Sequence, residues 1–229
     1  MLTAYDYPTA LALDGAGLDA LLVGDSMGEV ELGYPRTRDV TLEMMRHHVR
    51  AVANGVTRTH VVADLPADTY RDPQEAVTSS RVLMEAGADS VKLEGALIPQ
   101  VDAIIADGIP VMGHVGLLPQ TAEGGYRRQG TTPLEADRIL DDARALDAAG
   151  CYAIVIEAVP ADLAARITAE VGCPTIGIAA GTDSDGQVLV STDLIGQLPD
   201  PPAWMTPLAN VHGIVADAGR AFARGVRGD

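Results

Sequence analysis

Ionisable side chains stand at the points where short apolar runs of this chain stop. The runs end in two aspartates, two glutamates and a histidine: Asp25, Asp64, Glu94, His114 and Glu157. If the runs are parallel strands of one barrel, all of these side chains meet at the same mouth. Any one of them alone could cap a helix instead. Five together are harder to explain structurally, because clustered carboxylates repel unless a cation or a shared proton holds them.

Carboxylates without nearby pairs of histidine or cysteine favour Mg²⁺ or a similar divalent cation over structural zinc. Mg²⁺ normally keeps positions open for water or substrate. A small 2-oxo acid can fill two of them, through its carbonyl oxygen and one carboxylate oxygen. Coordination then draws electron density from the carbonyl and acidifies the adjacent C–H. The residues therefore predict metal-assisted enolisation of a 2-oxo acid.

Lys92 stands two residues before Glu94 and is the only lysine among sixteen basic residues, the others being arginine. A chain that uses arginine elsewhere and keeps one lysine in an apolar run is expected to need a compact ammonium there. It would neutralise a substrate carboxylate or a developing enolate. The alternatives are a lysine that has persisted by drift and a buried partner for Glu94.

Glu157 follows the apolar run AIVI at 153–156, which would desolvate it and suit it to act as a general base. A further metal ligand and a structural carboxylate are the alternative interpretations.

Alternating helices and strands would position these residues. Ala-rich amphipathic segments end at a glycine and an apolar run follows at once, at Gly17, Gly55, Gly87, Gly108, Gly150 and Gly172. Glycine in the left-handed conformation ends helices, and near-continuous apolar runs are typical of strands buried on both faces. The pattern predicts helices over 42–54, 73–86, 133–149, 161–171 and 208–226. Strands near 2–5 and 187–190 bring the number of predicted strands to eight.

Short connections between alternating strands and helices imply parallel strands joined by right-handed crossovers. We therefore predict an α/β fold, a (β/α)₈ TIM barrel, as a single domain over residues 1–229; an open doubly wound sheet is the alternative. The Gly-rich segment 113–133 is predicted to be a flap over the site. Cys151 and Cys173 fall at predicted strand starts and are interpreted as small buried residues.

The net charge of −16 argues against nucleic acid and anionic membranes as partners, since both need basic patches. No apolar run reaches the ~18 residues of a membrane span, and no early stretch has the pattern of a signal peptide. The chain is predicted to be cytoplasmic.

Short motifs follow one another in a telling order: TAYD at 3–6, VGDSMG at 23–28, ADLP at 63–66, VKLEG at 91–95, GHVGL at 113–117, GGY at 124–126, IEAVP at 156–160 and DGQVLV at 185–190. This series resembles the ketopantoate hydroxymethyltransferase (3-methyl-2-oxobutanoate hydroxymethyltransferase) family of phosphoenolpyruvate/pyruvate-type barrels. The resemblance covers most of the chain.

The resemblance implies that Asp25 and Asp64 bind Mg²⁺, with Glu94 as a direct or water-mediated ligand. Glu157 would remove the proton from C3 of 3-methyl-2-oxobutanoate. The enolate would attack the methylene carbon of the co-substrate 5,10-methylenetetrahydrofolate and give 2-dehydropantoate, a step of pantothenate biosynthesis. The family also implies a homo-oligomer, a decamer.

The resemblance further implies a set of residues that contact the oxo acid. The principal contacts would be Asp25, Ser26, Asp64 and Lys92, and the lesser ones Tyr5 and His114.

The chain departs from the family pattern away from the metal and enolisation residues. It has Ala67 where a phenylalanine is expected, a shorter loop at 121–124, and AWMTP at 203–207 in place of a basic-aromatic stretch. The departures leave folate use and the identity of the oxo acid open, so a paralogue acting on another 2-oxo acid is the main alternative. A C–C or C–P lyase or mutase typically carries a loop cysteine, which 113–133 lacks. A non-enzymatic binding barrel is the last alternative.

Overall fold

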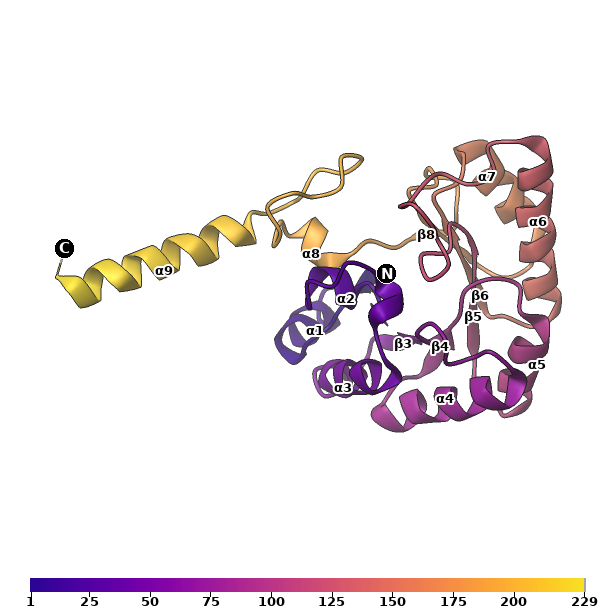
Figure 1. Ribbon diagram of the computed structural model, residues 1–229, viewed down its shortest axis with the longest axis horizontal. Helices are drawn as coiled ribbons and strands as arrows, with labels where there is room; N and C mark the ends of the chain where they lie inside the picture. The colour runs from indigo at the N-terminus through magenta and orange to yellow at the C-terminus, as the bar shows by residue number, and fades with distance from the viewer. Residues whose placement is uncertain (229) are drawn as a thin grey trace. The chain divides into compact units, whose positions relative to one another are not determined.

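The computed structural model describes residues 1–228 and contains a sheet of eight parallel strands in sequential order (Figure 1). The strands are β1 (Leu2–Thr3), β2 (Ala20–Val23), β3 (His60–Asp64), β4 (Ser90–Lys92), β5 (Val111–Gly116), β6 (Ala153–Glu157), β7 (Thr175–Ile178) and β8 (Gly186–Gln187). The nitrogen of Met1, next to β1, donates to the backbone oxygen of Gln187 in β8 at 2.9 Å, which brings the two edges of the sheet together. The predicted (β/α)₈ barrel is confirmed.

Helices connect most of the strands. They are α1 (Tyr7–Asp14), α2 (Met27–Val30), a 3₁₀ turn η1 (Thr37–Asp39), α3 (Leu42–Ala53), α4 (Pro73–Ala86), α5 (Ile98–Ala106), α6 (Pro133–Ala148) and α7 (Ala161–Glu170). Figure 1 shows α4, α5 and α6 along the outer side of the strands. The link between β7 and β8 holds no helix.

The chain divides into two compact units, Met1–Val188 and the part from Leu189 onward. The first unit holds all eight strands and helices α1 to α7. The second holds α8 (Ser191–Leu194) and α9 (Val211–Arg227), and α9 has no buried residue. A single domain over the whole chain stays a prediction, whereas the barrel itself is complete within the first unit.

Local signals account for where the helices begin and end. Asp72 caps α4 by accepting from the backbone N–H of Glu75, Pro73 occupies its first turn, and Gly87 ends it in the left-handed conformation. Thr132 and Glu135 form a capping box at the start of α6. These helices agree with the predicted ranges to within one residue, whereas the last helix begins at Val211 rather than at 208.

The predictions for two glycines and for the flap need correction. Gly55 and Gly172 are not among the glycines with positive φ. Gly55 instead allows a close approach, because a Cβ there would lie 2.7 Å from the backbone oxygen of Tyr7. The predicted flap is shorter, since β5 runs on to Gly116 and pairs there with Glu157.

The edge strands were placed only roughly. The first covers Leu2–Thr3 rather than 2–5, and the last covers Gly186–Gln187 rather than 187–190. Cys151 is buried and Cys173 half-buried, both just before a strand, so the predicted placement of the cysteines is confirmed and full burial holds for Cys151 alone.

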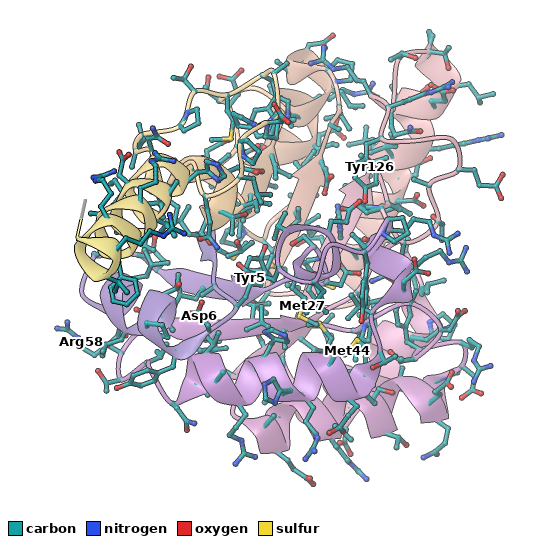
Figure 2. The ribbon with its side chains drawn as sticks, turned by 60° about the vertical axis from the view of Figure 1, so that its left-hand side comes forward. Tyr5, Asp6, Met27, Met44, Arg58 and Tyr126 are labelled. Carbon is teal, nitrogen blue, oxygen red and sulfur yellow. The ribbon has the colours of Figure 1, made fainter. Side chains whose placement is uncertain are left out.

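Side chains of the strands alternate between two apolar cores. Val61 and Ala63 of β3 belong to the larger core, which also contains the buried faces of the helices. Val62 belongs to a smaller core with Met112 and Val155, which fills the inside of the barrel. This period of two decides which ionisable residues face inward. Figure 2 shows the packed side chains, with Met27 in the interior and Arg58 at the periphery. Within residues 1–228, no helix is long and apolar enough to cross a bilayer.

Candidate active site

Strand alternation places four of the predicted residues inside the barrel at its carboxyl end. They share the inward phase of Val62, Met112 and Val155. The four are Asp64, Lys92, His114 and Glu157, of which all but His114 are the last residue of their strand. Asp25 and Glu94 follow two residues after the ends of β2 and β4. Asp25, Asp64, Lys92, Glu94 and His114 are each at most 5% exposed.

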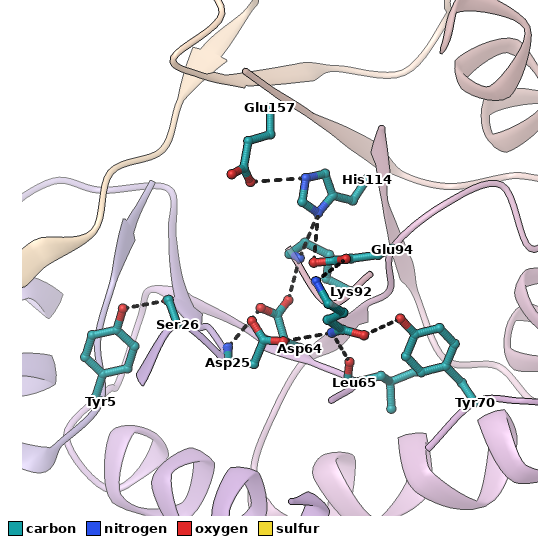
Figure 3. A network of polar contacts seen from close by, with 11 residues as sticks. Tyr5, Asp25, Ser26, Asp64, Leu65, Tyr70, Lys92, Glu94, His114 and Glu157 are labelled. Atoms are coloured by element: carbon teal, nitrogen blue, oxygen red, sulfur yellow. Dashed lines mark hydrogen bonds and ion pairs between the residues drawn. The ribbon is translucent and has the colours of Figure 1, made fainter. Parts of the chain in front are cut away.

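Asp25 and Asp64 lie next to each other. The backbone N–H of Asp25 donates to Oδ2 of Asp64 at 3.1 Å, and Nζ of Lys92 lies 2.7 Å from Oδ1 of the same carboxylate (Figure 3). Both oxygens of the Asp64 carboxylate therefore have a partner within the site, one a backbone N–H and the other an ammonium.

His114 lies between the ammonium and the predicted base. Nζ of Lys92 is 3.3 Å from Nδ1 of His114, and Nε2 of His114 is 3.2 Å from Oε2 of Glu157 (Figure 3). Burial first, and the Lys92 charge second, hold the pKa of His114 below its usual value. Because an ammonium can only donate, Nδ1 accepts and the ring hydrogen sits on Nε2, which faces Glu157.

The side chain of Glu157 is more exposed to solvent than we expected from the apolar residues that precede it in the sequence. Its side chain is 21% exposed, whereas that of His114 is 3% exposed. The desolvation expected from its sequence is thus only partial. The opening is what a base that must reach a substrate requires.

Burial and mutual repulsion shape the protonation of the acidic groups. Burial, and then the charge of Asp64, raise the pKa of Asp25 to about 7. Burial also raises the pKa of Glu94 well above its usual value. Burial opposes the charge on Lys92, but the nearby carboxylates of Asp64, Glu94 and Asp25 outweigh it and raise its pKa. The cluster carries more acidic groups than one ammonium neutralises, which favours a bound cation.

Tyr5 and Ser26 form a hydroxyl pair beside Asp25. Their oxygens are 2.9 Å apart, and Tyr5 is 2% exposed (Figure 3). The chain is tightly packed just before Ser26: a Cβ on Gly24 would lie 2.8 Å from Ser26 Oγ. The structure thus brings all of the sequence-predicted site residues to one mouth.

Two buried polar residues of the site were missed from the sequence. Gln120 donates from Nε2 to Oδ2 of Asp25 at 2.8 Å, and Tyr70 donates to Oε1 of Gln120 at 2.5 Å. Both belong to connections that follow strands, after β3 and β5. Their position a few residues past an apolar run was the only signal available.

A divalent cation fits this site through few protein ligands. Within the described residues 1–228, no three His, Cys, Asp or Glu side chains are arranged to hold an ion together. Mg²⁺ does not need such a set, because it is commonly held by one or two carboxylates and keeps water or substrate oxygens as its other ligands. Asp25 and Asp64, which lie next to each other at the barrel mouth, supply such a pair.

A polar loop borders the mouth between β5 and α6. The hydroxyl of Tyr126, labelled in Figure 2, donates to Oε2 of Glu29 in α2 at 2.9 Å. Gly124 and Gly125, just before it, have positive φ, which lets this segment turn sharply.

Solved structures share this barrel. The chain is similar to a putative phosphonomutase from Burkholderia cenocepacia J2315, with TM-score 0.66 and 14% identity over 100% of this chain and 92% of the other. It is also similar to a 2,3-dimethylmalate lyase described as a PEP mutase/isocitrate lyase superfamily member, with TM-score 0.62 and 19% identity over 99% and 81% of the chains. A phosphonopyruvate hydrolase solved with oxalate and Mg²⁺ matches with TM-score 0.65 and 12% identity over 98% and 92%.

These likenesses show a shared (β/α)₈-barrel fold, which in this chain has an acidic, lysine-containing mouth. Residues 1–229 match the family model of ketopantoate hydroxymethyltransferase, and the chain belongs to this family.

Relatives named 3-methyl-2-oxobutanoate hydroxymethyltransferase are close in sequence. One from Moorella thermoacetica is 54% identical over 202 residues, which covers 86% of this chain and 75% of the relative. One from Dehalococcoides mccartyi is 49% identical over 225 residues, with 95% and 80% covered. One from Thermus thermophilus is 47% identical over 232 residues, with 99% and 89% covered. Members of this family act on a small 2-oxo acid.

Proposed function

We propose that the chain transfers a hydroxymethyl group from 5,10-methylenetetrahydrofolate to 3-methyl-2-oxobutanoate and forms 2-dehydropantoate for pantothenate biosynthesis. The observation that carries the proposal is the buried group of Asp25, Asp64 and Lys92 beside Glu157, which is partly open to solvent and contacts the buried His114. Family membership supports the same reaction.

Asp25 and Asp64 would hold Mg²⁺ or a similar divalent cation, and Glu94 would help directly or through water. The bound ion would supply Lewis-acid polarisation of the carbonyl of the oxo acid. Lys92 would neutralise the carboxylate of the oxo acid and the charge that develops on its carbonyl oxygen. Ser26 would hold the carboxylate with Lys92, and Tyr5, hydrogen-bonded to Ser26, would support it.

Glu157 would take the proton from C3 of 3-methyl-2-oxobutanoate, as its partly open side chain at the barrel mouth allows. His114 is neutral and carries its hydrogen on the nitrogen that faces Glu157, so it would orient the carboxylate without competing for the proton. C3 would then form a new bond to the methylene carbon of the folate. Tetrahydrofolate would leave, and a water molecule would supply the hydroxyl oxygen of the product.

Deuterium exchange tests the first half of this reaction. We expect C3 of 3-methyl-2-oxobutanoate to exchange in D₂O with Mg²⁺ and without folate, as followed by proton NMR. Glu157→Gln should slow the exchange by about 10²–10⁴-fold, the usual contribution of a general base. Glu85→Gln, on an exposed helical surface, serves as the matched control. The proposal would be refuted if none of the 2-oxo acids tested showed metal-dependent exchange.

A panel of 2-oxo acids with 5,10-methylenetetrahydrofolate separates the proposed substrate from its alternatives. Mass spectrometry should detect a gain of one hydroxymethyl group on 3-methyl-2-oxobutanoate. A preference for another acid would instead identify a paralogue, an outcome that the small Ala67 and the loop after β5 make worth testing. Bond cleavage in the absence of folate would identify a lyase.

Self-association also belongs to the proposal. The family resemblance implies a homo-oligomer, a decamer. Light scattering coupled to gel filtration should give a mass several times that of one chain. A monomer at micromolar concentration would contradict it.

A further inference from the structure

Gln120 contacts three parts of the acidic site at once. Its Nε2 donates to Oδ2 of Asp25 at 2.8 Å and to the backbone oxygen of Leu65 at 2.9 Å. Its backbone N–H donates to Oε2 of Glu94 at 3.0 Å. One residue in the connection after β5 therefore holds two carboxylates that follow two other strands, β2 and β4.

The orientation of the Gln120 amide follows from its partners. A backbone carbonyl only accepts hydrogen bonds, so the NH₂ group must face Leu65, and the same nitrogen then faces Asp25. The amide oxygen then faces the hydroxyl of Tyr70, which donates to it at 2.5 Å. Figure 3 shows Tyr70, Leu65 and Asp25 around this point. A flipped amide would turn its oxygen toward the carbonyl of Leu65 and lose that bond, so Leu65 selects the orientation and the hydroxyl of Tyr70 then occupies the amide oxygen.

Neither residue is placed to be a base, a metal ligand or a surface contact. Gln120 is 3% exposed and Tyr70 is 9% exposed, and the side chain of Gln120 is directed to groups that other strands supply. A buried amide whose two hydrogens and oxygen are all engaged fixes its neighbours more strictly than a solvated one. Here the amide occupies Oδ2 of Asp25 and so fixes the orientation of that carboxylate.

We propose that Gln120 is a positioning residue for divalent-cation binding: it sets the orientation of the Asp25 carboxylate and, through its backbone, that of Glu94, while Tyr70 holds its amide in register. The inference rests on the proposed metal-assisted function. Residues that orient ligands in this way typically change metal affinity by 10–100-fold when they are replaced.

Titration calorimetry with Mg²⁺ alone, without substrate, tests the proposal. Gln120→Met keeps the length of the side chain and removes its donors, and it should weaken Mg²⁺ binding by about 10–100-fold. Tyr70→Phe removes one hydroxyl and should weaken it less. If Tyr70 acts through Gln120, the double variant should bind Mg²⁺ no more weakly than Gln120→Met. Losses that add in full would overturn the role given to Tyr70.

Gln100→Met is the matched control. Gln100 is also a buried glutamine, 8% exposed, but its amide donates to the backbone oxygens of Tyr70 and Arg71 and contacts no carboxylate. We expect a loss of thermal stability there with unchanged Mg²⁺ affinity. A folded Gln120→Met variant with wild-type affinity would overturn the proposal, as would an equal loss of affinity in Gln100→Met. If Gln120→Met does not fold, the Mg²⁺ affinity of Tyr70→Phe is compared with that of Gln100→Met, and equal affinities would overturn the proposal.

The wild-type protein separates this inference from the function on which it rests. If it binds no Mg²⁺ and exchanges no C3 hydrogen, the metal-assisted function itself fails. If it does both and Gln120→Met does both equally well, only the positioning role fails.

Discussion

At the scale of single residues, the site depends on one compact cation. The ammonium of Lys92 lies 2.7 Å from Asp64 and 3.3 Å from His114, in a space where its side chain is 5% exposed. Three hydrogens on one nitrogen can serve these two partners and still face a substrate carboxylate. A planar guanidinium spreads its donors over a wider fork and cannot reproduce the arrangement.

Lys92→Arg should therefore lose most activity although the charge is kept. We expect the rate of C3 exchange to fall by at least ~10²-fold, the usual effect of removing one electrostatic contact to a developing oxyanion. Thermal unfolding would show whether the variant is folded, and Arg58→Lys, at the periphery, is the control for a basic exchange (Figure 2). Near-normal turnover would make Lys92 a structural partner of Asp64.

Residues that end strands were predictable, and residues in the connections were not. The alternation of apolar side chains fixes the inward phase of Asp64 and His114, so their meeting follows from the sequence once the barrel is accepted. No such period governs the path of a loop. Gln120 and Tyr70 therefore came to light only through their contacts with Asp25 and with each other.

At the scale of elements, the end of α3 packs closely against α1. Gly55→Ala should destabilise the protein by about 1–3 kcal/mol, because the new methyl group would lie 2.7 Å from the backbone oxygen of Tyr7 and 3.0 Å from the nitrogen of Leu11. Urea unfolding measures the change. Gly15→Ala, where nothing lies within 4 Å and φ is −90°, is the matched control and should cost nothing. Equal stabilities would show that the two helices can separate freely.

Asp14 ties the end of α1 to the segment before β3. Its carboxylate accepts hydrogen bonds from Thr57, Arg58 and Thr59, led by the Thr57 side chain, and these hold its pKa well below the usual range. A pKa that folding lowers stabilises the folded state fully above the unfolded pKa of about 4, and this contribution declines as the pH drops from there through the lower pKa of the folded state.

Asp14→Asn should therefore lower the melting temperature at pH 7 and by less at pH 3.5. Differential scanning calorimetry across this range checks the prediction, with Asp183→Asn in an exposed loop as the control. If the difference in melting temperature between Asp14→Asn and the wild type stayed constant with pH, the charge of the Asp14 carboxylate would not be its cause.

Helices with explicit capping residues were predicted best. Asp72 with Pro73 and Thr132 with Pro133 fix α4 and α6 because each signal is local. The end of β5 was misjudged because Gly113 and Gly116 look like loop residues. Gly113 lies inside the strand, where a Cβ would lie 2.9 Å from Cδ1 of Leu146 in α6 and would have to displace that side chain. Gly113 and Leu146 are far apart in the sequence, so local sequence patterns do not reveal this contact.

At the scale of the whole molecule, charge is the dominant surface property. The net charge is −16 and the sequence pI is about 4.5. The exposed ion pairs, such as Arg46 with Glu43, each contribute little, whereas repulsion among the excess acidic groups acts over the whole surface.

Sodium chloride should therefore stabilise the protein at pH 7. We expect a rise in melting temperature on the order of 2–4 °C between low salt and 0.5 M, about what ~1 kcal/mol of relieved repulsion gives in a chain of this size. The effect should nearly vanish at the pI. A fall in melting temperature with salt would show that the surface ion pairs outweigh the repulsion.

The barrel was predictable at this scale, and the division of the chain was not. Repeated strand and helix signals indicate a closed parallel barrel because few topologies satisfy them. The second unit begins after Val188 without any linker composition, and α9 looks like any amphipathic helix in sequence. Amphipathicity shows that a face must be covered, but it does not show by what.

One consequence follows from the placement of the only lysine. Acylating reagents that select ε-amines find no such group on the folded surface, since Lys92 is 4% exposed and enclosed by the barrel. Each molecule that opens uncovers a single reactive amine. Mass spectrometry after a brief pulse of reagent would thus read the fraction of open barrels directly, with no dye, tag or engineered cysteine.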